Sequence, residues 1–197
     1  MSPSFLARTK RIMSTMAGLA LVASIAQTAA GQTKPSGTPI FGLGYADIGP
    51  TIGVGGLGSA SASFGGRFER AIKALPDMGN GILGIQAAFE YYSWSSGSIA
   101  GYNWSYRYIP VGVTGNYHFK LDDPKIDPFV GLGLGYNVVN CSWSGPNASS
   151  TGCGYSSGIY FIGRAGARYF FSPKMAMYGD VGAGGATLNL GVMFKLM

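Results

Sequence analysis

The only histidine, His118, is the first residue that could carry out acid–base chemistry. An imidazole titrates near neutral pH and commonly acts as the base that activates a nucleophile. Such a mechanism needs positioned partner groups, and the chain has no second histidine to supply one. His118 also falls on the polar face of an alternating segment, close to a short turn. We therefore interpret it as a buried, hydrogen-bonded residue, and we predict no catalytic residue and no enzymatic activity.

A second candidate is the segment GLGLG at 131–135, which looks like a phosphate-binding loop. The dinucleotide-binding motif needs a strand before the glycines and a helix after them. Here apolar residues alternate with the glycines throughout 130–138, so the glycines lie inside one strand. We reject a phosphate site. The glycines are expected to face inward and to leave volume for Arg164 and Arg168 on the neighbouring strand.

The two cysteines, Cys141 and Cys153, flank the loop-like segment SWSGPNASSTG. In an oxidising compartment we expect them to form a disulfide bond that closes a short loop. Two free thiols or a metal site are the alternatives. Two cysteines with no histidine or acid nearby make a poor zinc site, so we predict no metal and no cofactor.

The composition is unlike that of a soluble domain. Charged residues make up 11% of the chain, against about 25% in soluble domains. There are 33 glycines, and aromatic residues reach 13%. A chain that faces lipid needs little surface charge, whereas a soluble one needs more. The net charge of +6 is carried partly by three bases among the first eleven residues, and the remaining balance is too weak to predict a nucleic-acid partner.

The amino-terminal segment has the three parts of a secretory signal. Arg8, Lys10 and Arg11 form a positive start, an apolar stretch covers 13–26, and small residues follow. The alternative is a membrane-anchoring helix, but the apolar stretch is shorter than the ~20 residues that a helix needs to cross a bilayer. We predict a signal peptide at 1–30, a short linker at 31–37 and one domain at 38–197.

The domain alternates apolar and polar residues almost throughout, which is typical of strands. Short turns of the kind PDMGN, LDDPKID and FSPKM alternate with longer Gly- and Ser-rich connections. This order is typical of an up-and-down barrel with short turns at one end and longer loops at the other. The strands are expected near 39–48, 60–74, 82–95, 103–120, 127–142, 157–171, 175–183 and 187–197.

The alternation gives each strand one apolar face and one small or polar face. On 82–95, Ile85 and Phe89 share one face, and Gln86 and Glu90 share the other. A soluble sandwich or lipocalin would turn the apolar face inward, and a membrane barrel would turn it outward. Because the other face has many glycines and few charges, the composition favours an all-β, eight-stranded antiparallel transmembrane β-barrel with a narrow interior.

Aromatic residues gather near both ends of the expected strands, as they do at the two interfaces of a membrane. Sandwich-core packing and hairpin pairing are the alternative explanation. The predicted belts are Tyr91, Trp94, Trp104 and Tyr106 beside a long loop, and Tyr117, Phe119, Tyr169 and Phe171 beside the short turns.

Six charged side chains fall at alternate strand positions that are expected to face the interior of the barrel, which we call inward parity. Unpaired charges in a narrow interior would be costly, so we predict an ion-pair network there. Its members are Arg67, Glu69, Glu90, Arg164, Arg168 and Asp180. A network that plugs the barrel is favoured over one that lines a pore, because eight strands leave an interior just wide enough for side chains.

Three segments, DPFVGLGLGYNVVN, GRAGARYFFSPKMAMYGDVGAG and TLNLGVMFKLM, resemble the small OmpA/OmpX-type outer-membrane β-barrel proteins. The resemblance covers most of 38–197. It implies a bacterial outer-membrane location, contact with outer-membrane lipid and recognition by the barrel-assembly machinery. Family members commonly end in an aromatic residue that this machinery reads. Here Phe194 lies three residues before the end, and Met197 is last.

We therefore expect an outer-membrane barrel with a largely plugged polar lumen. Its expected role is structural, or interaction with an unknown surface partner through the extracellular loops. The alternative is a narrow pore or a barrel that binds a small or lipidic ligand.

Overall fold

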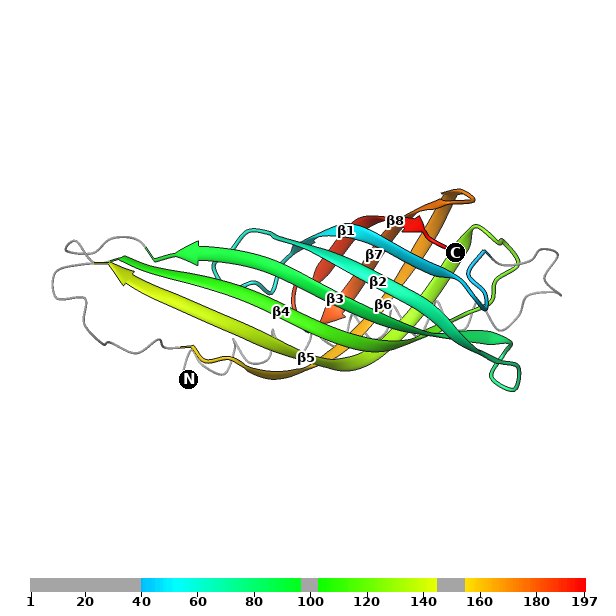
Figure 1. The fold of residues 1–197 in the computed structure, drawn as a ribbon, viewed down its shortest axis with the longest axis horizontal. Helices are drawn as coiled ribbons and strands as arrows, with labels where there is room; N and C mark the ends of the chain where they lie inside the picture. The colour runs from blue at the N-terminus through cyan, green and yellow to red at the C-terminus, as the bar shows by residue number, and fades with distance from the viewer. Residues whose placement is uncertain (1–39, 97–102, 145–154) are drawn as a thin grey trace, which may run out of the picture.

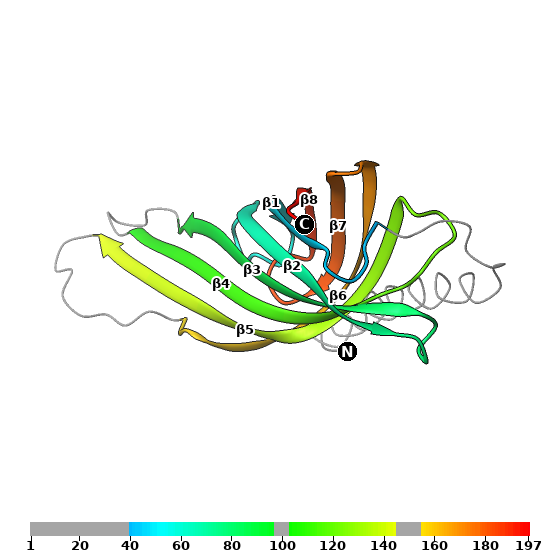
Figure 2. The same ribbon diagram turned by 45° about the vertical axis from the view of Figure 1, so that its right-hand side comes forward.

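The computed structural model describes residues 40–96, 103–144 and 155–197. These residues form a closed barrel in which each strand pairs antiparallel with the next and β8 pairs with β1 (Figures 1 and 2). The strands are β1 (Ala46–Val54), β2 (Ser63–Leu75), β3 (Gly81–Ser95), β4 (Asn103–His118), β5 (Ile126–Ser144), β6 (Gly158–Ser172), β7 (Met175–Ala183) and β8 (Leu188–Lys195). The all-β, eight-stranded, antiparallel up-and-down barrel is thereby confirmed.

The predicted signal peptide and linker lie outside the described residues, and so does Cys153. In the described part of the chain, no helix has the length and apolar character needed to cross a membrane.

The first strand lies later in the chain than predicted. The sequence suggested a strand near 39–48, whereas β1 runs through Ala46–Val54. Glycine sets this register: a Cβ at Gly49 would lie 1.9 Å from the carbonyl oxygen of Val192 on β8, so only glycine permits this approach. The segment before β1 packs into one mouth of the barrel instead, where Phe41 is buried.

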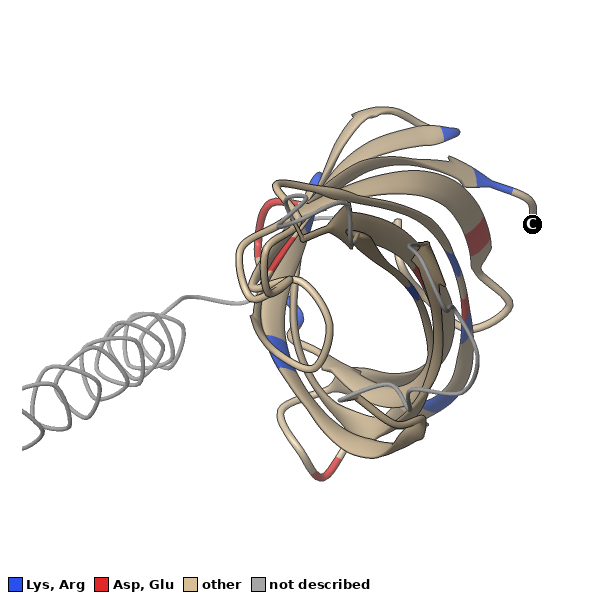
Figure 3. Ribbon diagram, turned by 90° about the vertical axis from the view of Figure 1, so that its left-hand side faces the viewer, with Lys and Arg blue, Asp and Glu red and all other residues tan. Residues whose placement is uncertain are grey.

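The barrel carries polar side chains inside and apolar side chains outside. Outward-facing Leu132 and Phe161 are 77% and 82% exposed. Figure 3 shows the strands closing into a ring on which few positions are charged. A lipocalin-type barrel would have the opposite arrangement. The buried polar residues are Asp47, Thr51, Ser63, Arg67, Glu69, Gln86, Glu90, Thr114, Asn116, His118, Asp127, Arg164, Arg168, Asp180 and Asn189.

Three neighbouring strands continue beyond the barrel rim and form a three-stranded extension, which we call the wing (Figure 1). It comprises 92–95 of β3, 103–108 of β4 and 139–144 of β5. The pairing of β2 with β3 ends at Tyr91, and the pairing of β6 with β5 ends at Asn137. We call this end of the barrel the wing end, and the opposite end, with the short turns, the turn end.

The faces of the wing exchange their character relative to the barrel below it. On the barrel, the outward face is apolar up to Tyr91, Ile109 and Val138. On the wing, the outward residues are Ser93, Ser95, Asn103, Ser105, Arg107, Asn140, Ser142 and Ser144. The inward residues are Tyr92, Trp94, Trp104, Tyr106, Tyr108, Val139, Cys141 and Trp143. Successive side chains of a strand point to opposite faces. The outward surface therefore changes from apolar on the barrel to polar on the wing, and the inward surface changes from polar to aromatic.

Candidate functional site

The interior is organised around Arg168 of β6, whose side chain is 0% exposed. Its Nε donates to Oδ2 of Asp47 at 2.9 Å, and its Nη1 donates to Oδ2 of Asp127 at 3.1 Å. Its Nη2 donates to Glu69. A guanidinium presents five N–H donors in one plane, so this arginine ties β6 to β1, β5 and β2. Three carboxylates around one arginine leave a negative excess that a second cation must reduce.

His118 lies between two of these carboxylates. Its Nδ1 is 2.9 Å from Oδ1 of Asp127, and its Nε2 is 2.8 Å from Oε1 of Glu69. A neutral imidazole has a single N–H and would direct a lone pair at one carboxylate, whereas an imidazolium donates from both nitrogens. The geometry therefore fits a positively charged His118. Its interpretation as a buried, hydrogen-bonded residue is confirmed.

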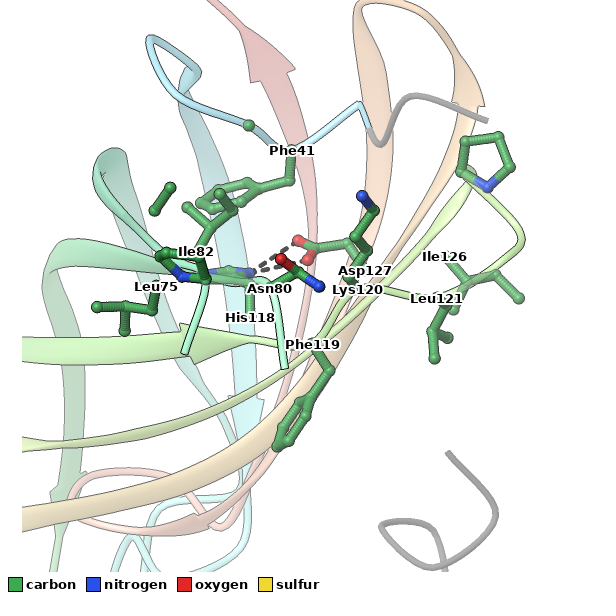
Figure 4. A pocket seen from close by; sticks show the side chains of 14 residues that line it. Phe41, Leu75, Asn80, Ile82, His118, Phe119, Lys120, Leu121, Ile126 and Asp127 are labelled. Atoms are coloured by element: carbon green, nitrogen blue, oxygen red, sulfur yellow. Dashed lines mark hydrogen bonds and ion pairs between the residues drawn. The ribbon is translucent and has the colours of Figure 1, made fainter. Parts of the chain in front are cut away.

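Phe41 covers this cluster at the turn end. Its ring stacks on the His118 imidazole with 3.7 Å between centroids, and the Arg168 guanidinium carbon lies 5.1 Å from its centroid. Figure 4 shows Phe41 beside the paired His118 and Asp127. These three residues line a cavity of ≈ 310 Å³. Apolar side chains such as Ile82 complete the wall of this cavity.

A second cluster, nearer the wing end, is centred on Asp180 of β7. This carboxylate accepts hydrogen bonds from Arg164 and Tyr178, and from Asn189 at 3.1 Å. Arg67 lies 3.2 Å from Asp180. These contacts join β2, β6 and β8 to β7.

Arg67 also links Asp180 to a further carboxylate, Glu90, at 3.5 Å. The amide of Gln86 connects the two clusters. It accepts from Arg67 at 3.0 Å and donates to Glu69 at 3.0 Å. The polar interior is therefore one continuous network that runs along the barrel.

The wing end of the lumen is closed by the connection between β7 and β8. Arg164 donates to the carbonyl oxygens of Gly184 at 3.1 Å and Thr187 at 3.3 Å. Glu90 accepts from the backbone N–H of Ala186 at 3.3 Å. In the described residues, the cavity between Arg67, Arg164 and the neighbouring walls measures only ≈ 20 Å³.

All six residues of the predicted network lie in this interior. Arg168 pairs with Glu69, the other four pair among themselves, and Gln86 joins the two sets. Asp47 and Asp127, which complete the cluster around Arg168, were not predicted from the sequence. Asp127 occupies the same alternate positions of β5 as Gly131 and Gly133, which were expected to face inward. This alternation could have identified Asp127 as an interior residue. Its place in the turn-like segment LDDPKID concealed it.

The predicted aromatic belts need a correction. Tyr91, Tyr169 and Phe171 face outward and are exposed. Tyr117 and Phe119 have the same outward parity on β4 and the residue after it. The assignment of Trp94, Trp104 and Tyr106 to the lipid-facing belt is wrong, because all three lie on the inner face of the wing. Tyr106 is only 9% exposed.

Physically, the error came from using position along the chain without parity. Tyr106 shares the parity of the inward-facing Asn116 and His118 on β4, so the sequence contained the correct signal. Cys141 lies on the same inner face of the wing. Its bond with Cys153 stays a prediction, because Cys153 lies outside the described residues.

The carboxylates around Arg168 leave no arrangement suited to a metal ion. Within the described ranges, no group of three or more His, Cys, Asp or Glu side chains could hold one.

No family model and no curated protein matches the chain. Several solved structures are similar to it. The outer membrane protein OprG from Pseudomonas aeruginosa is 11% identical with a TM-score of 0.48, over 83% of this chain and 99% of that chain. Ail, the attachment invasion locus protein of Yersinia pestis, in complex with the heparin analogue sucrose octasulfate, is 12% identical with a TM-score of 0.46, over 77% and 93%. These neighbours are small outer-membrane barrels.

The outer membrane enzyme PagL also matches, with 18% identity and a TM-score of 0.41 over 77% of this chain and 99% of that chain. The similar structures thus include an enzyme as well as other barrels.

Proposed function

We propose that the chain is an outer-membrane β-barrel with a sealed polar lumen, which serves a structural or surface-interaction role through its wing end. Outer-membrane lipid and the barrel-assembly machinery are the partners that this role implies. The amino-terminal signal pattern supports export. A closed barrel supports membrane insertion, because it leaves no strand edge with unpaired backbone groups in the lipid.

The distribution of apolar side chains supports the same location. Burying one large apolar side chain contributes about 1.5–3 kcal/mol, and the outer wall exposes many, including Leu132 and Phe161. Lipid would cover them. The inversion at Tyr91, Ile109 and Val138 supplies an outer boundary for the apolar zone, and the wing beyond it has the polar outward face that contact with water or lipid headgroups requires.

The observation that carries the sealed lumen is the continuous network from Asp47 to Glu90. The central cavity of ≈ 20 Å³ has room for about one water molecule. The β7–β8 connection closes the wing end, and Phe41 covers the cluster at the turn end. A conducting path would require several buried ion pairs to separate, which is costly for each charge left unpaired.

Planar-bilayer recording tests this proposal. The refolded mature protein is expected to insert without giving stable unitary currents. The double variant Arg67→Ala/Gln86→Ala removes the two side chains that join the clusters, and it should also give no stable current, because the β7–β8 connection and Phe41 still close the two ends. Stable currents from the unaltered protein, with insertion verified by heat-modifiable gel migration, would overturn the sealed lumen.

A second candidate function is binding of a small ligand. Its specific support is the pair of cavities at the two ends of the plugged lumen, with volumes of ≈ 310 Å³ at the turn end and ≈ 470 Å³ at the wing end. Both lie in or near the range of about 300–1,000 Å³ that is usual for small-molecule sites.

A further inference from the structure

The cavity at the wing end lies above the closed lumen. Its lining includes Tyr92, Asn137, Ser156 and Tyr160. Its floor is the β7–β8 connection, which Arg164 and Glu90 hold through backbone hydrogen bonds. The cavity opens at the wing end and adjoins the small central cavity, with which it shares Pro110, Tyr160 and Gly184 in its lining.

Glycines keep this cavity open. Gly158 lies on the inward face at the start of β6, and a Cβ added there would meet no atom within 4 Å. Gly184 and Gly185 adopt φ values of +93° and +85°, a region that other residues avoid. Their backbone forms part of the wall, and an added Cβ would crowd the backbone of Phe161 at Gly184 or the carboxylate of Glu90 at Gly185.

The walls combine aromatic rings with uncharged hydrogen-bonding groups. Tyr92 stacks on Tyr108 with 4.9 Å between centroids. Asn137 contributes a side-chain amide to the wall. Ser156 and Tyr160 contribute hydroxyl groups. A ligand with apolar C–H faces and a rim of hydroxyl groups would satisfy both kinds of wall.

The wing extends this surface away from the cavity. Tyr155 is 55% exposed, and its ring lies edge-on to Tyr106 at 5.5 Å and to Trp94 at 6.5 Å. Trp104 continues the row of rings beside Tyr106. An extended ligand held in the cavity would meet these rings next.

Charge narrows the ligand class. Among the described residues that make up the wing and the connections around the cavity rim, Arg107 is the only charged one, and it lies on the outward face. A polysulfated or phosphorylated ligand needs several Lys or Arg side chains, and a cationic one needs carboxylates. The rim offers neither, so an uncharged ligand fits best.

We propose that the wing-end cavity binds a neutral hexose unit of an oligosaccharide, with the adjoining units passing along the aromatic inner face of the wing. This inference rests on the proposed outer-membrane barrel, which places the cavity on the outside of the cell. It gives the second candidate function a defined site and ligand class.

The test uses the refolded mature protein in detergent, with cellohexaose and maltohexaose as neutral probes and a heparin hexasaccharide as the charged comparison. All three tryptophans of the chain, Trp94, Trp104 and Trp143, lie on the inner face of the wing, so intrinsic fluorescence reports on this surface. At least one neutral probe is expected to give a saturable change, and the heparin fragment should give none.

Gly158→Leu would fill the cavity and should weaken binding at least tenfold. Gly115→Leu is the matched control, because Gly115 faces outward on β4 and also has no atom within 4 Å of an added Cβ. It should bind within twofold of the unaltered protein. Heat-modifiable migration establishes that both variants fold.

Three results would overturn the proposal: no response to either neutral probe, equal binding by Gly158→Leu, or binding of the heparin fragment alone. The bilayer recording is independent of all three. A conducting barrel that still binds cellohexaose would refute the sealed lumen but support the sugar site. A barrel that gives no current and binds neither neutral probe would support the sealed lumen but refute the sugar site.

Discussion

Arg168 and Asp47 stand 121 positions apart in the chain, yet Nε of one donates to Oδ2 of the other at 2.9 Å. The bond crosses the lumen from β6 to β1. It is formed only when the barrel has closed, since β1 and β6 are not neighbours in the sheet. The interior network and the closure of the barrel therefore depend on each other.

Arg168→Met should destabilise the barrel by about 3–5 kcal/mol, because it leaves buried Asp47, Glu69 and Asp127 without their shared partner. Arg168→Lys should recover only part of this loss, since one ammonium cannot reproduce the planar donor set. The measurement is the urea midpoint of the refolded protein in detergent. Arg107→Met on the exposed face of the wing is the control and should shift stability by less than about 0.5 kcal/mol; equal losses for Arg168→Met and Arg107→Met would contradict the assigned role.

Much of this interior could be predicted from parity alone. Inward parity identified Arg168 and its five predicted companions, because successive side chains of a strand alternate between its two faces. What parity could not supply was the choice of partners, which depends on register across the barrel. Asp47 needed the correct start of β1, and that start depends on the close approach of Gly49 to β8.

His118 should carry a proton on both ring nitrogens at neutral pH. The reason is geometric, since Asp127 and Glu69 present carboxylate oxygens to Nδ1 and Nε2 respectively. Nitrogen-15 NMR of histidine-labelled protein measures this directly, with both nitrogens expected at protonated chemical shifts. A shift typical of an unprotonated nitrogen at either position would contradict the doubly protonated form.

Gly133→Ala should reduce the folding yield severely. The role predicted from the sequence was to leave room for Arg164 and Arg168, but the structure gives a different reason. An added Cβ would lie 2.0 Å from the carbonyl oxygen of Val113 and 2.7 Å from Cα of Thr114, both on β4. The close approach of β4 and β5 therefore requires glycine.

The readout for Gly133→Ala is the fraction that migrates as the folded form without heating. Gly115→Ala is the control, because its Cβ would enter open space on the outer wall. Leu132→Ile, on the outward face of β5, should also fold normally. If Gly133→Ala and Gly115→Ala gave the same yield, the close-approach argument would be wrong.

Cys141 and Cys153 should be joined in the exported protein. Export into an oxidising compartment favours the bond, and Cys141 lies on the inner face of the wing. Intact-mass analysis after alkylation should show no added groups without reductant and two with it. Two added groups without reductant would contradict the pairing.

The inversion between barrel and wing predicts where the outer surface of the membrane lies along β4. Ser105 and Val113 both face outward on this strand, but Ser105 lies on the wing and Val113 lies within the apolar zone. In a variant without native cysteines, Ser105→Cys in liposomes should react with a water-soluble maleimide, and Val113→Cys should not, because lipid covers it. Both should react after unfolding in urea, which controls for intrinsic reactivity. Rapid labelling of folded Val113→Cys in liposomes would mean that water reaches the middle of the apolar wall, and the membrane orientation proposed for the barrel would then have to be abandoned.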